Sequence, residues 1–296
     1  MLPPWLGSAI AFLYGIVVGS FLNVCIYRLP EEQSIVHPPS HCPSCNTRLK
    51  TVDLVPLASF LLLGRKCRYC GAPITWRYFV VELITGLLFV GVYLTYGCSI
   101  DFFAYALFIS ALLIAFFVDL DCFIIPDQVW IAGVIIGIAR DIAHLIAGND
   151  ILLRIDIPFT AYYLPMLPSV AGIVVCGGIF YLIAYVSYYI FRPRDEAARQ
   201  DYEGAMGGGD VKLAGAVGAV LGIIPALVSF FLAVILGTLV GVTYIILKAR
   251  AEKRSMPWRT EIPFGPYMVA GAIAVILASP QLEAIWNAWV NLITLR

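Results

Sequence analysis

Long apolar runs recur along the chain, with short polar segments between them. A helix crosses the core of a bilayer with about 20 consecutive apolar residues, so each run that approaches this length predicts a membrane-spanning helix. The eight runs are residues 5–27, 79–96, 102–118, 129–147, 169–191, 210–223, 224–247 and 264–279. The sixth run is short, and if the Ile223-Ile224-Pro225 junction after it is not a turn, the count falls to seven.

This pattern predicts an all-α polytopic membrane protein with about eight transmembrane helices. Residues 28–78 form the one long polar insert, and they are the only stretch suited to a small separate module. We therefore expect three parts. A first transmembrane helix occupies 1–27, the module occupies 28–78, and a membrane domain with about seven helices occupies 79–296.

The basic residues predict the orientation of these helices. With eight spans, one side of the membrane receives the insert and the loops after the fifth and seventh runs. That side carries all of the 19 Lys and Arg residues except Arg140, Arg154 and Arg296. Loops rich in Lys and Arg stay in the cytoplasm. We expect the N-terminus outside and the insert, Asp119 and Asp210 at the cytoplasmic face.

Composition strengthens the membrane assignment. The chain is 61% hydrophobic and 13% charged, which is far from the balance of a soluble domain. Its formal net charge is zero, and we expect the lipid bilayer, and no nucleic acid, as a partner.

Four cysteines of the insert have the spacing of metal ligands. Cys42 and Cys45 form one Cys-x2-Cys pair, and Cys67 and Cys70 form a second. Two such pairs place four thiolates around one ion, which is the arrangement of a structural zinc site without an open position. The alternative is four reduced thiols in a basic loop. The other cysteines are scattered in or beside apolar runs, and no structural disulfide is expected.

Two aspartates at the ends of apolar runs are the candidates for chemistry. Asp119 follows the third run, and Asp210 follows the glycines Gly207, Gly208 and Gly209. Carboxylates in membrane helices are costly, and they are therefore candidates for function. A pair of aspartates that share a proton can activate water and polarise a scissile carbonyl. The position of each residue on its own helix suggests that Asp210 is the base and that Asp119 carries the proton.

The glycines predict room for an extended substrate segment beside Asp210, because residues without Cβ let two backbones approach. The alternative is a flexible loop followed by an N-capping aspartate. Asp121 is expected to be solvated, and Asp127 is expected to cap the next helix. Glu82 lies about one turn inside the second run, where it could pair with Arg77 or line a polar cavity.

Together these segments resemble the type IV prepilin peptidases, which are the bifunctional leader peptidases and N-methyltransferases of type IV pilus and type II secretion systems. Gly-x-Gly-Asp alone would indicate only the wider class of intramembrane aspartyl proteases. The resemblance rests on residues 19–30, the two Cys-x2-Cys pairs, and residues 77–78, 81–83, 119–127, 207–210 and 262–266.

The resemblance implies an activity, a location and cofactors. Members cleave the short basic leader of prepilins or pseudopilins at the cytoplasmic face of the inner membrane, with aspartates that correspond to Asp119 and Asp210. They then methylate the new N-terminal amine with S-adenosylmethionine. No methyl-donor motif is visible in the sequence, and we place that site near the zinc module and Glu82.

Two other classes of function compete with this interpretation. A transporter would also place acids in its helices, but it predicts ionisable residues near the middle of the bilayer and inverted repeats. A non-enzymatic zinc-containing scaffold of a secretion complex is the second rival. Such a scaffold would tolerate Asn at positions 119 and 210.

Overall fold

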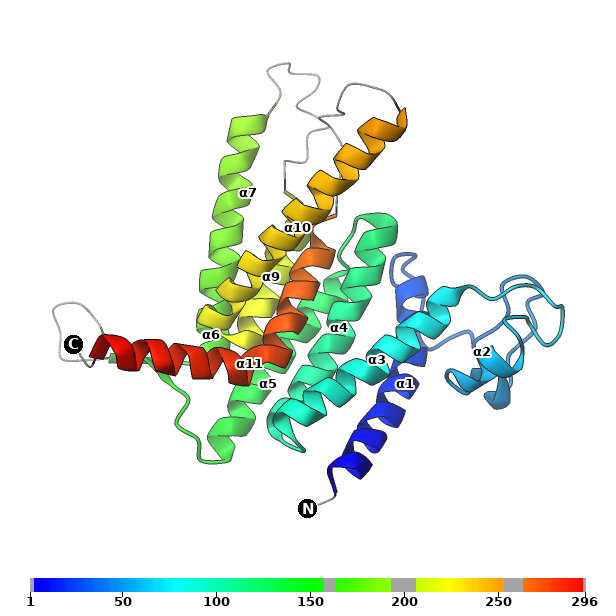
Figure 1. Cartoon of the computed structure of the whole chain (residues 1–296), viewed down its shortest axis with the longest axis horizontal. Coiled ribbons are helices and arrows are strands. Elements are labelled where there is room, and N and C mark those ends of the chain that lie inside the picture. The colour runs from blue at the N-terminus through cyan, green and yellow to red at the C-terminus, as the bar shows by residue number, and fades with distance from the viewer. Residues whose placement is uncertain (1–2, 157–162, 193–205, 253–262, 295–296) are drawn as a thin grey trace. The chain divides into compact units, whose positions relative to one another are not determined.

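The structure, a computed structural model, describes residues 3–156, 163–192, 206–252 and 263–294. These residues are mostly helical, as predicted (Figure 1). The helices, in chain order, are α1 (Pro4–Arg28), η1 (Thr51–Leu54), α2 (Ala58–Leu62), α3 (Trp76–Tyr96), α4 (Ile100–Cys122), α5 (Asp127–Ile146), α6 (Pro168–Gly172), η2 (Ile173–Gly177), α7 (Gly178–Phe191), α9 (Gly208–Leu221), α10 (Ile223–Glu252) and α11 (Gly265–Thr294).

One short hairpin departs from the all-helical prediction. Strand β1 (Leu153–Asp156) pairs antiparallel with β2 (Tyr163–Met166), with Leu153 opposite Met166. The hairpin connects α5 to α6. The sequence between the fourth and fifth apolar runs predicts no element, because four-residue strands leave too short a pattern to detect.

The apolar runs form helices, and the chain has the character of a multi-pass membrane protein. Within the described residues, six helical segments are long and apolar enough to cross a membrane. They are α1, α3, α4, α5, the continuous segment Pro168–Phe191, and Ile223–Lys248 of α10. Helix α9 has 14 residues, and the apolar part of α11, Gly265–Gln281, is also short. The count of eight spans stays a prediction.

The junction between the sixth and seventh runs is a turn. Helix α9 ends at Leu221, and Gly222 follows with a φ of +78°, which is a conformation that favours glycine. Helix α10 then begins at Ile223. The predicted orientation stays a prediction, because several basic residues on which it rests lie outside the described residues: Arg194, Arg199, Lys253, Arg254, Arg259 and Arg296.

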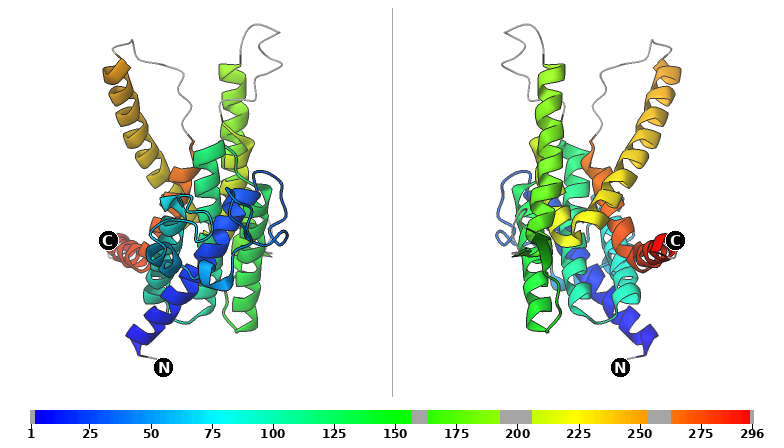
Figure 2. Two further views of the ribbon diagram at one scale, coloured as in Figure 1. Left: turned by 90° about the vertical axis from the view of Figure 1, so that its right-hand side faces the viewer. Right: turned by 90° about the vertical axis from the view of Figure 1, so that its left-hand side faces the viewer.

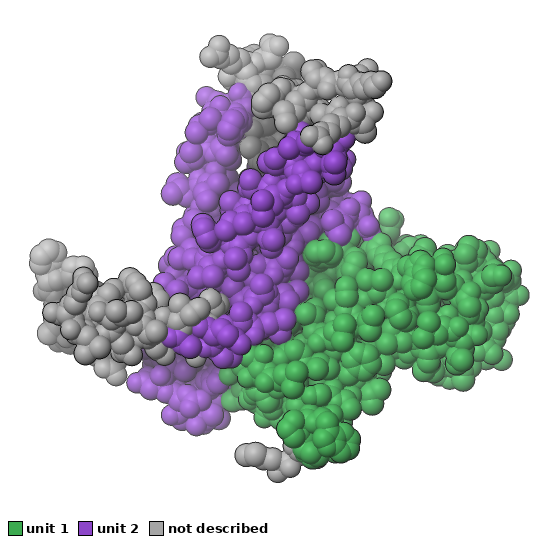
Figure 3. Space-filling view, in the orientation of Figure 1, with its two compact units in different colours: residues 1–118 green, residues 119–296 purple. Residues whose placement is uncertain are grey.

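The chain divides into two compact units, residues 1–118 and 119–296, which Figure 3 shows in different colours. The boundary falls within α4, so Asp119 is the first residue of the second unit. The predicted boundaries at residues 27 and 78, which delimit the insert, differ from this boundary between compact units and stay a prediction.

In the first unit, α1 and α3 cross closely through small residues. A Cβ added to Gly15 would lie 2.8 Å from the Cα of Gly86, so the two backbones nearly touch. Small residues commonly allow such an approach between membrane helices. The buried Asn23 donates a hydrogen bond from Nδ2 to the Tyr78 carbonyl oxygen at 3.1 Å, and this bond ties the end of α1 to the start of α3.

In the second unit, α9 is the central helix. Its residues from Leu213 to Val220 are all buried. A Cβ added to Gly172 of α6 would overlap the Gly218 carbonyl group of α9, and one added to Gly137 of α5 would overlap the Ala219 carbonyl group. Helices α7 and α10 extend beyond this packed region and diverge toward their far ends (Figure 2). The small residues of α9 thus allow neighbouring helices to reach its backbone.

We expect Gly172→Ala to destabilise this packing, because the new methyl group has no space against Gly218. Overpacking of this kind typically costs about 1–3 kcal/mol in the free energy of unfolding. Gly178→Ala is the matched control, because a Cβ there meets nothing within 4 Å. Chemical denaturation in detergent would measure both variants. Equal stabilities for the two variants would contradict the packing argument.

Candidate active site and metal centre

The two Cys-x2-Cys pairs form turns of the same design. The Cys42 N–H donates to the Thr47 carbonyl at 3.0 Å, and the Cys67 N–H donates to the Ala72 carbonyl at 2.8 Å. The residue after each second cysteine, Asn46 or Gly71, has a positive φ. Each turn is closed by an antiparallel bridge, between His41 and Arg48 and between Lys66 and Pro73.

These turns bring four thiols together. The Sγ atoms of Cys42, Cys45, Cys67 and Cys70 all lie within 4.8 Å of one another, and those of Cys42 and Cys70 are 3.9 Å apart. Sulfur atoms around a tetrahedral zinc ion, at about 2.3 Å from the metal, are separated by about 3.8 Å. The four cysteines therefore fit a zinc ion. All eight cysteines of the chain are described, and all are free thiols.

The protonation of the thiols favours a bound cation. Hydrogen bonding with Thr47 lowers the pKa of Cys45 to about 6, which favours the thiolate that a metal requires. The Ala72 N–H acts to lower the pKa of Cys70, but desolvation and the neighbouring thiols outweigh it and raise that pKa to about 11. Hydrogen bonds from the N–H groups of Cys70 and Tyr69 lower the pKa of Cys67 as well. Each cysteine turn thus favours one thiolate, and a divalent cation would favour the remaining two.

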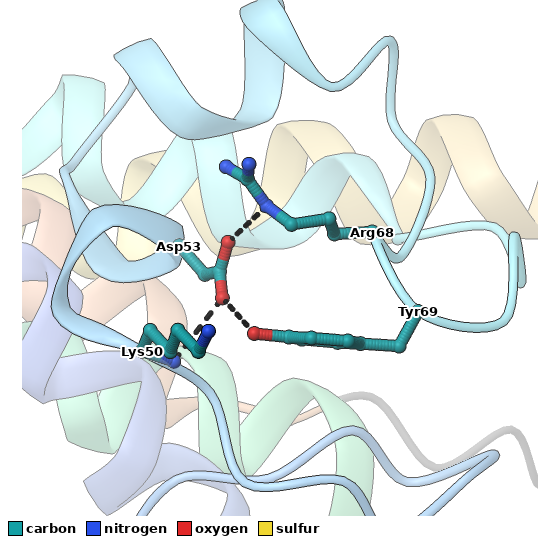
Figure 4. A network of polar contacts seen from close by, with 4 residues as sticks. All are labelled: Lys50, Asp53, Arg68 and Tyr69. Atoms are coloured by element: carbon teal, nitrogen blue, oxygen red, sulfur yellow. Dashed lines mark hydrogen bonds and ion pairs between the residues drawn. The ribbon is translucent and has the colours of Figure 1, made fainter.

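A buried carboxylate connects the second cysteine turn to η1 (Figure 4). Asp53 accepts hydrogen bonds from Arg68 Nε at 2.6 Å, from the Tyr69 hydroxyl at 2.8 Å and from the Lys50 N–H at 3.1 Å. Its side chain is 3% exposed. Desolvation acts to raise the pKa of Asp53, but the bonds from Tyr69, Lys50 and Arg68 outweigh it and hold that pKa below its usual value. The two residues between Cys67 and Cys70 thereby fix their turn.

Asp119 is a buried carboxylate near the C-terminal end of α4. It lies against Gly265, the first residue of α11, where an added Cβ would be 2.5 Å from Asp119 Oδ2. This oxygen has no hydrogen-bond partner among the described residues. In the sequence, Gly265 stands out only as part of the resemblance to a family. The structure adds a reason for glycine there, because any side chain would displace the Asp119 carboxylate.

Asp210 lies in the first turn of α9, immediately after the three glycines. Its N–H donates to the Gly207 carbonyl at 3.1 Å. Among the described residues, a Cβ on Gly207 would meet only Asp210 Oδ2, at 3.6 Å, and one on Gly208 would meet nothing within 4 Å. Packing against the described part of the chain therefore does not require glycine at 207 or 208. Gly209 differs, because a Cβ there would lie 3.1 Å from Ile125.

The two candidate aspartates lie in neighbouring parts of the second unit. A Cβ on Gly209, the residue before Asp210, would lie 3.1 Å from Ile125, and a Cβ on Gly265, which lies against Asp119, would lie 3.3 Å from the same side chain. Ile125 therefore packs close to the positions of both aspartates. The sequence assigned Asp210 as the base and Asp119 as the proton carrier from the dipole of the helix that bears each residue. A second helix also acts on Asp119. The N-terminal end of α11 also faces Asp119, and its dipole favours the anion there.

The expectation that Asp127 caps α5 is wrong. Asp127 is the first residue of that helix, Pro126 occupies the cap position, and no side-chain cap is formed. Instead, the Asp127 carboxylate accepts hydrogen bonds from Lys212 Nζ at 2.5 Å and from Trp130 Nε1 at 3.0 Å. The Lys212 ammonium also lies 5.9 Å from the centre of the Trp130 ring. This contact ties the start of α5 to the first turns of α9. Asp121 is exposed, as expected.

Glu82 is buried between α1 and α3 and holds the insert in place. Its Oε2 accepts a hydrogen bond of 2.7 Å from the N–H of Leu57, the residue that precedes α2. The sequence left open whether Glu82 pairs with Arg77 or lines a polar cavity, and both alternatives stay predictions beside the bond from Leu57. The local sequence around Glu82 gives no sign of Leu57, because the bond joins residues in separate elements.

Comparisons with known proteins agree with this geometry. The profile described as the Bacterial Peptidase A24 N-terminal domain matches residues 13–96, which include the four cysteines. The profile described as the Type IV leader peptidase family matches residues 106–242, which include Asp119 and Asp210. No solved structure matches the chain.

Curated relatives cover most of the chain. A prepilin leader peptidase/N-methyltransferase of Bacillus subtilis is 31% identical over 91% of this chain and 93% of its own length. Proteins of the same name from Myxococcus xanthus and Aeromonas hydrophila are 33% and 32% identical. They align with 86% and 92% of this chain, and with 69% and 91% of their own lengths.

We expect the purified chain to contain about one zinc ion, held by the four thiolates. Cys67→Ser should reduce this content to near zero, because three thiolates and a hydroxyl hold zinc poorly. Cys176→Ser is the control, since Cys176 is buried in η2 and lies outside the cluster. Elemental analysis of the purified proteins would measure the content. Zinc retained in the Cys67 variant at the level of the control would contradict the assignment.

We expect Asp127 and Lys212 to be energetically coupled. The residues are exposed, so a double-mutant cycle with Asp127→Ala and Lys212→Ala should give a coupling of about 0.2–1 kcal/mol. Denaturant unfolding would measure it. The control cycle pairs Asp127→Ala with Lys248→Ala, because Lys248 lies over the Tyr244 ring instead. Additive effects in the first cycle would show that the ion pair does not stabilise the start of α9.

Proposed function

Because this chain belongs to the type IV leader peptidase family, we propose that it is a membrane aspartyl endopeptidase. Its substrates are type IV prepilins or pseudopilins, from which it removes the basic leader at the cytoplasmic face of the inner membrane. It then N-methylates the new N-terminal residue, with S-adenosylmethionine as the methyl donor. The transporter and scaffold alternatives gain no support from the relatives, which are all named as peptidases and methyltransferases.

The observation that carries the proposal is the packing of Gly209 and Gly265 against Ile125, which places Asp119 and Asp210 in neighbouring parts of one unit. One carboxylate acts as the base and removes a proton from water, and the resulting hydroxide adds to the scissile carbonyl carbon. The other carboxyl group donates a proton toward the carbonyl oxygen. When the tetrahedral intermediate collapses, the C–N bond breaks and the amine leaves with a proton. The products are the free leader carboxylate and a new amino terminus.

The glycines suit an extended substrate beside this pair. Gly207 and Gly208 are exposed, and among the described residues a Cβ on either would meet no atom closer than 3.6 Å. A peptide backbone could therefore approach Asp210 without displacing atoms of the described residues. Gly209 would keep its place beside Ile125 and would not itself contact the substrate. Cleavage at this position suits a leader that ends where a hydrophobic helix enters the membrane.

The zinc ion has a structural role in the proposal. Four thiolates leave no open coordination position for water or substrate. The insert is too small to fold around a hydrophobic core alone, and the ion would hold its two cysteine turns together. The methyl donor would bind near this module. Glu82 would serve there as a positioning residue, because its carboxylate already holds the Leu57 N–H.

We expect Asp119→Asn and Asp210→Asn each to lower prepilin cleavage by at least about two orders of magnitude, because neither amide can move the required proton. Asp121→Asn is the matched control and should retain cleavage, since Asp121 is exposed near the same helix end. Mass spectrometry of a prepilin incubated with each purified variant would detect the loss of the leader. A mass gain of one methyl group with S-adenosylmethionine would test the second activity. Full cleavage by both Asn variants would show that these aspartates are not the catalytic pair, and no cleavage by the unmodified protein would support the scaffold alternative.

A further inference from the structure

Helix α2 of the insert presents two leucines that nothing in the first unit covers. Phe60 is 5% exposed and faces the protein, whereas Leu61 is 62% exposed and Leu62 is 86% exposed. Single exposed leucines are common on proteins. Two adjacent leucines on one short helix form a small apolar surface, and the surroundings of α2 indicate what covers it.

Contacts with α3 fix the position of α2 along a membrane helix. The Phe60 ring lies 5.2 Å from the Trp76 ring and 5.3 Å from the Phe79 ring. The Leu57 N–H, at the start of α2, donates to Glu82 at 2.7 Å. Trp76 is the first residue of α3, and Glu82 lies six residues further, which is about 9 Å along the helix. Helix α2 therefore lies beside the first two turns of a candidate membrane span.

The residues that follow α2 have the chemistry of a membrane surface. Arg65 and Lys66 are exposed, and the Arg65 guanidinium lies 4.8 Å from the centre of the Trp76 ring. Tryptophan and basic residues are typical of the headgroup region, where the ring is half buried and the cation meets lipid phosphate. No acidic residue interrupts the segment from Leu61 to Lys66. This combination of leucines and cations fits an anionic bilayer.

We propose that Leu61 and Leu62 of α2 insert into the interfacial region of an anionic lipid bilayer and seat the zinc module on the membrane. The leucines lose contact with water, and Arg65 and Lys66 remain at the level of the phosphates. The insert is then part of the membrane-bound body and not a freely exposed domain. The proposal rests on α3 as a membrane span and does not require the peptidase activity.

The test uses the full-length protein in vesicles of phosphatidylcholine with phosphatidylglycerol. An environment-sensitive fluorescent amino acid replaces Leu62 or, as the control, Ser44, an exposed residue of the first cysteine turn. We expect lipids with a doxyl group near the headgroup to quench position 62 several-fold more than position 44, and aqueous iodide to do the reverse. Equal iodide quenching at the two positions would overturn the proposal. Protection of position 62 from both quenchers would show that protein covers it, and would overturn the proposal too.

A second experiment tests the contribution of charge. Lys66→Gln should reduce the additional lipid quenching that position 62 gains when phosphatidylglycerol is added to phosphatidylcholine vesicles. The matched control is Lys50→Gln, which removes an exposed cation from the residue that precedes η1 in the sequence. Zinc content should be the same in all variants, which separates loss of membrane contact from loss of the module's fold. No gain from phosphatidylglycerol in the parent protein would overturn the anionic part of the proposal.

Discussion

The close approach of backbones around α9 is the constraint on which the second unit depends. Gly218 meets Gly172 of α6 and Cys176 of η2, and Ala219 meets Gly137 of α5. Membrane helices lack a strong hydrophobic drive to associate, so close van der Waals packing of small residues holds them together. A stretch of π-helix in η2 lies at this crossing. Single π-helical turns of this kind interrupt the regular α-helical geometry. This turn lies where Cys176 of η2 packs against Gly218 of α9.

The position of α9 determines the position of Asp210, and several weaker contacts complete the setting. Asp127 and Lys212 join the starts of α5 and α9, while Ile125 occupies the space between Gly209 and Gly265. Among the described residues Asp119 Oδ2 has no hydrogen-bond partner, and it lies against the first residue of α11. Burial of a carboxylate oxygen without a partner is costly, which distinguishes Asp119 from the hydrogen-bonded Asp53 and Asp127.

The sequence predicted much of this because the relevant signals are local. Apolar runs define the helices, Cys-x2-Cys pairs define the metal cluster, and acids at the ends of apolar runs define the candidate pair. Contacts between distant residues have no such signal. The placement of Gly265 against Asp119, of Leu57 against Glu82 and of Lys212 against Asp127 depends on how helices pack. The assignment of Asp127 as a cap was wrong because Pro126 occupies the cap position, and the carboxylate instead contacts Lys212 of another helix.

The hydrogen bond between Glu82 and Leu57 has a mechanical consequence for the insert. It attaches the start of α2 to the interior of α3, well beyond the first residue of that helix. A transmembrane helix adjusts its tilt to the hydrocarbon thickness of the surrounding lipid. Because the attachment lies inside α3, the insert must rotate with the helix when the tilt changes. With α3 as a membrane span, the placement of the four cysteines would therefore follow the thickness of the surrounding lipid.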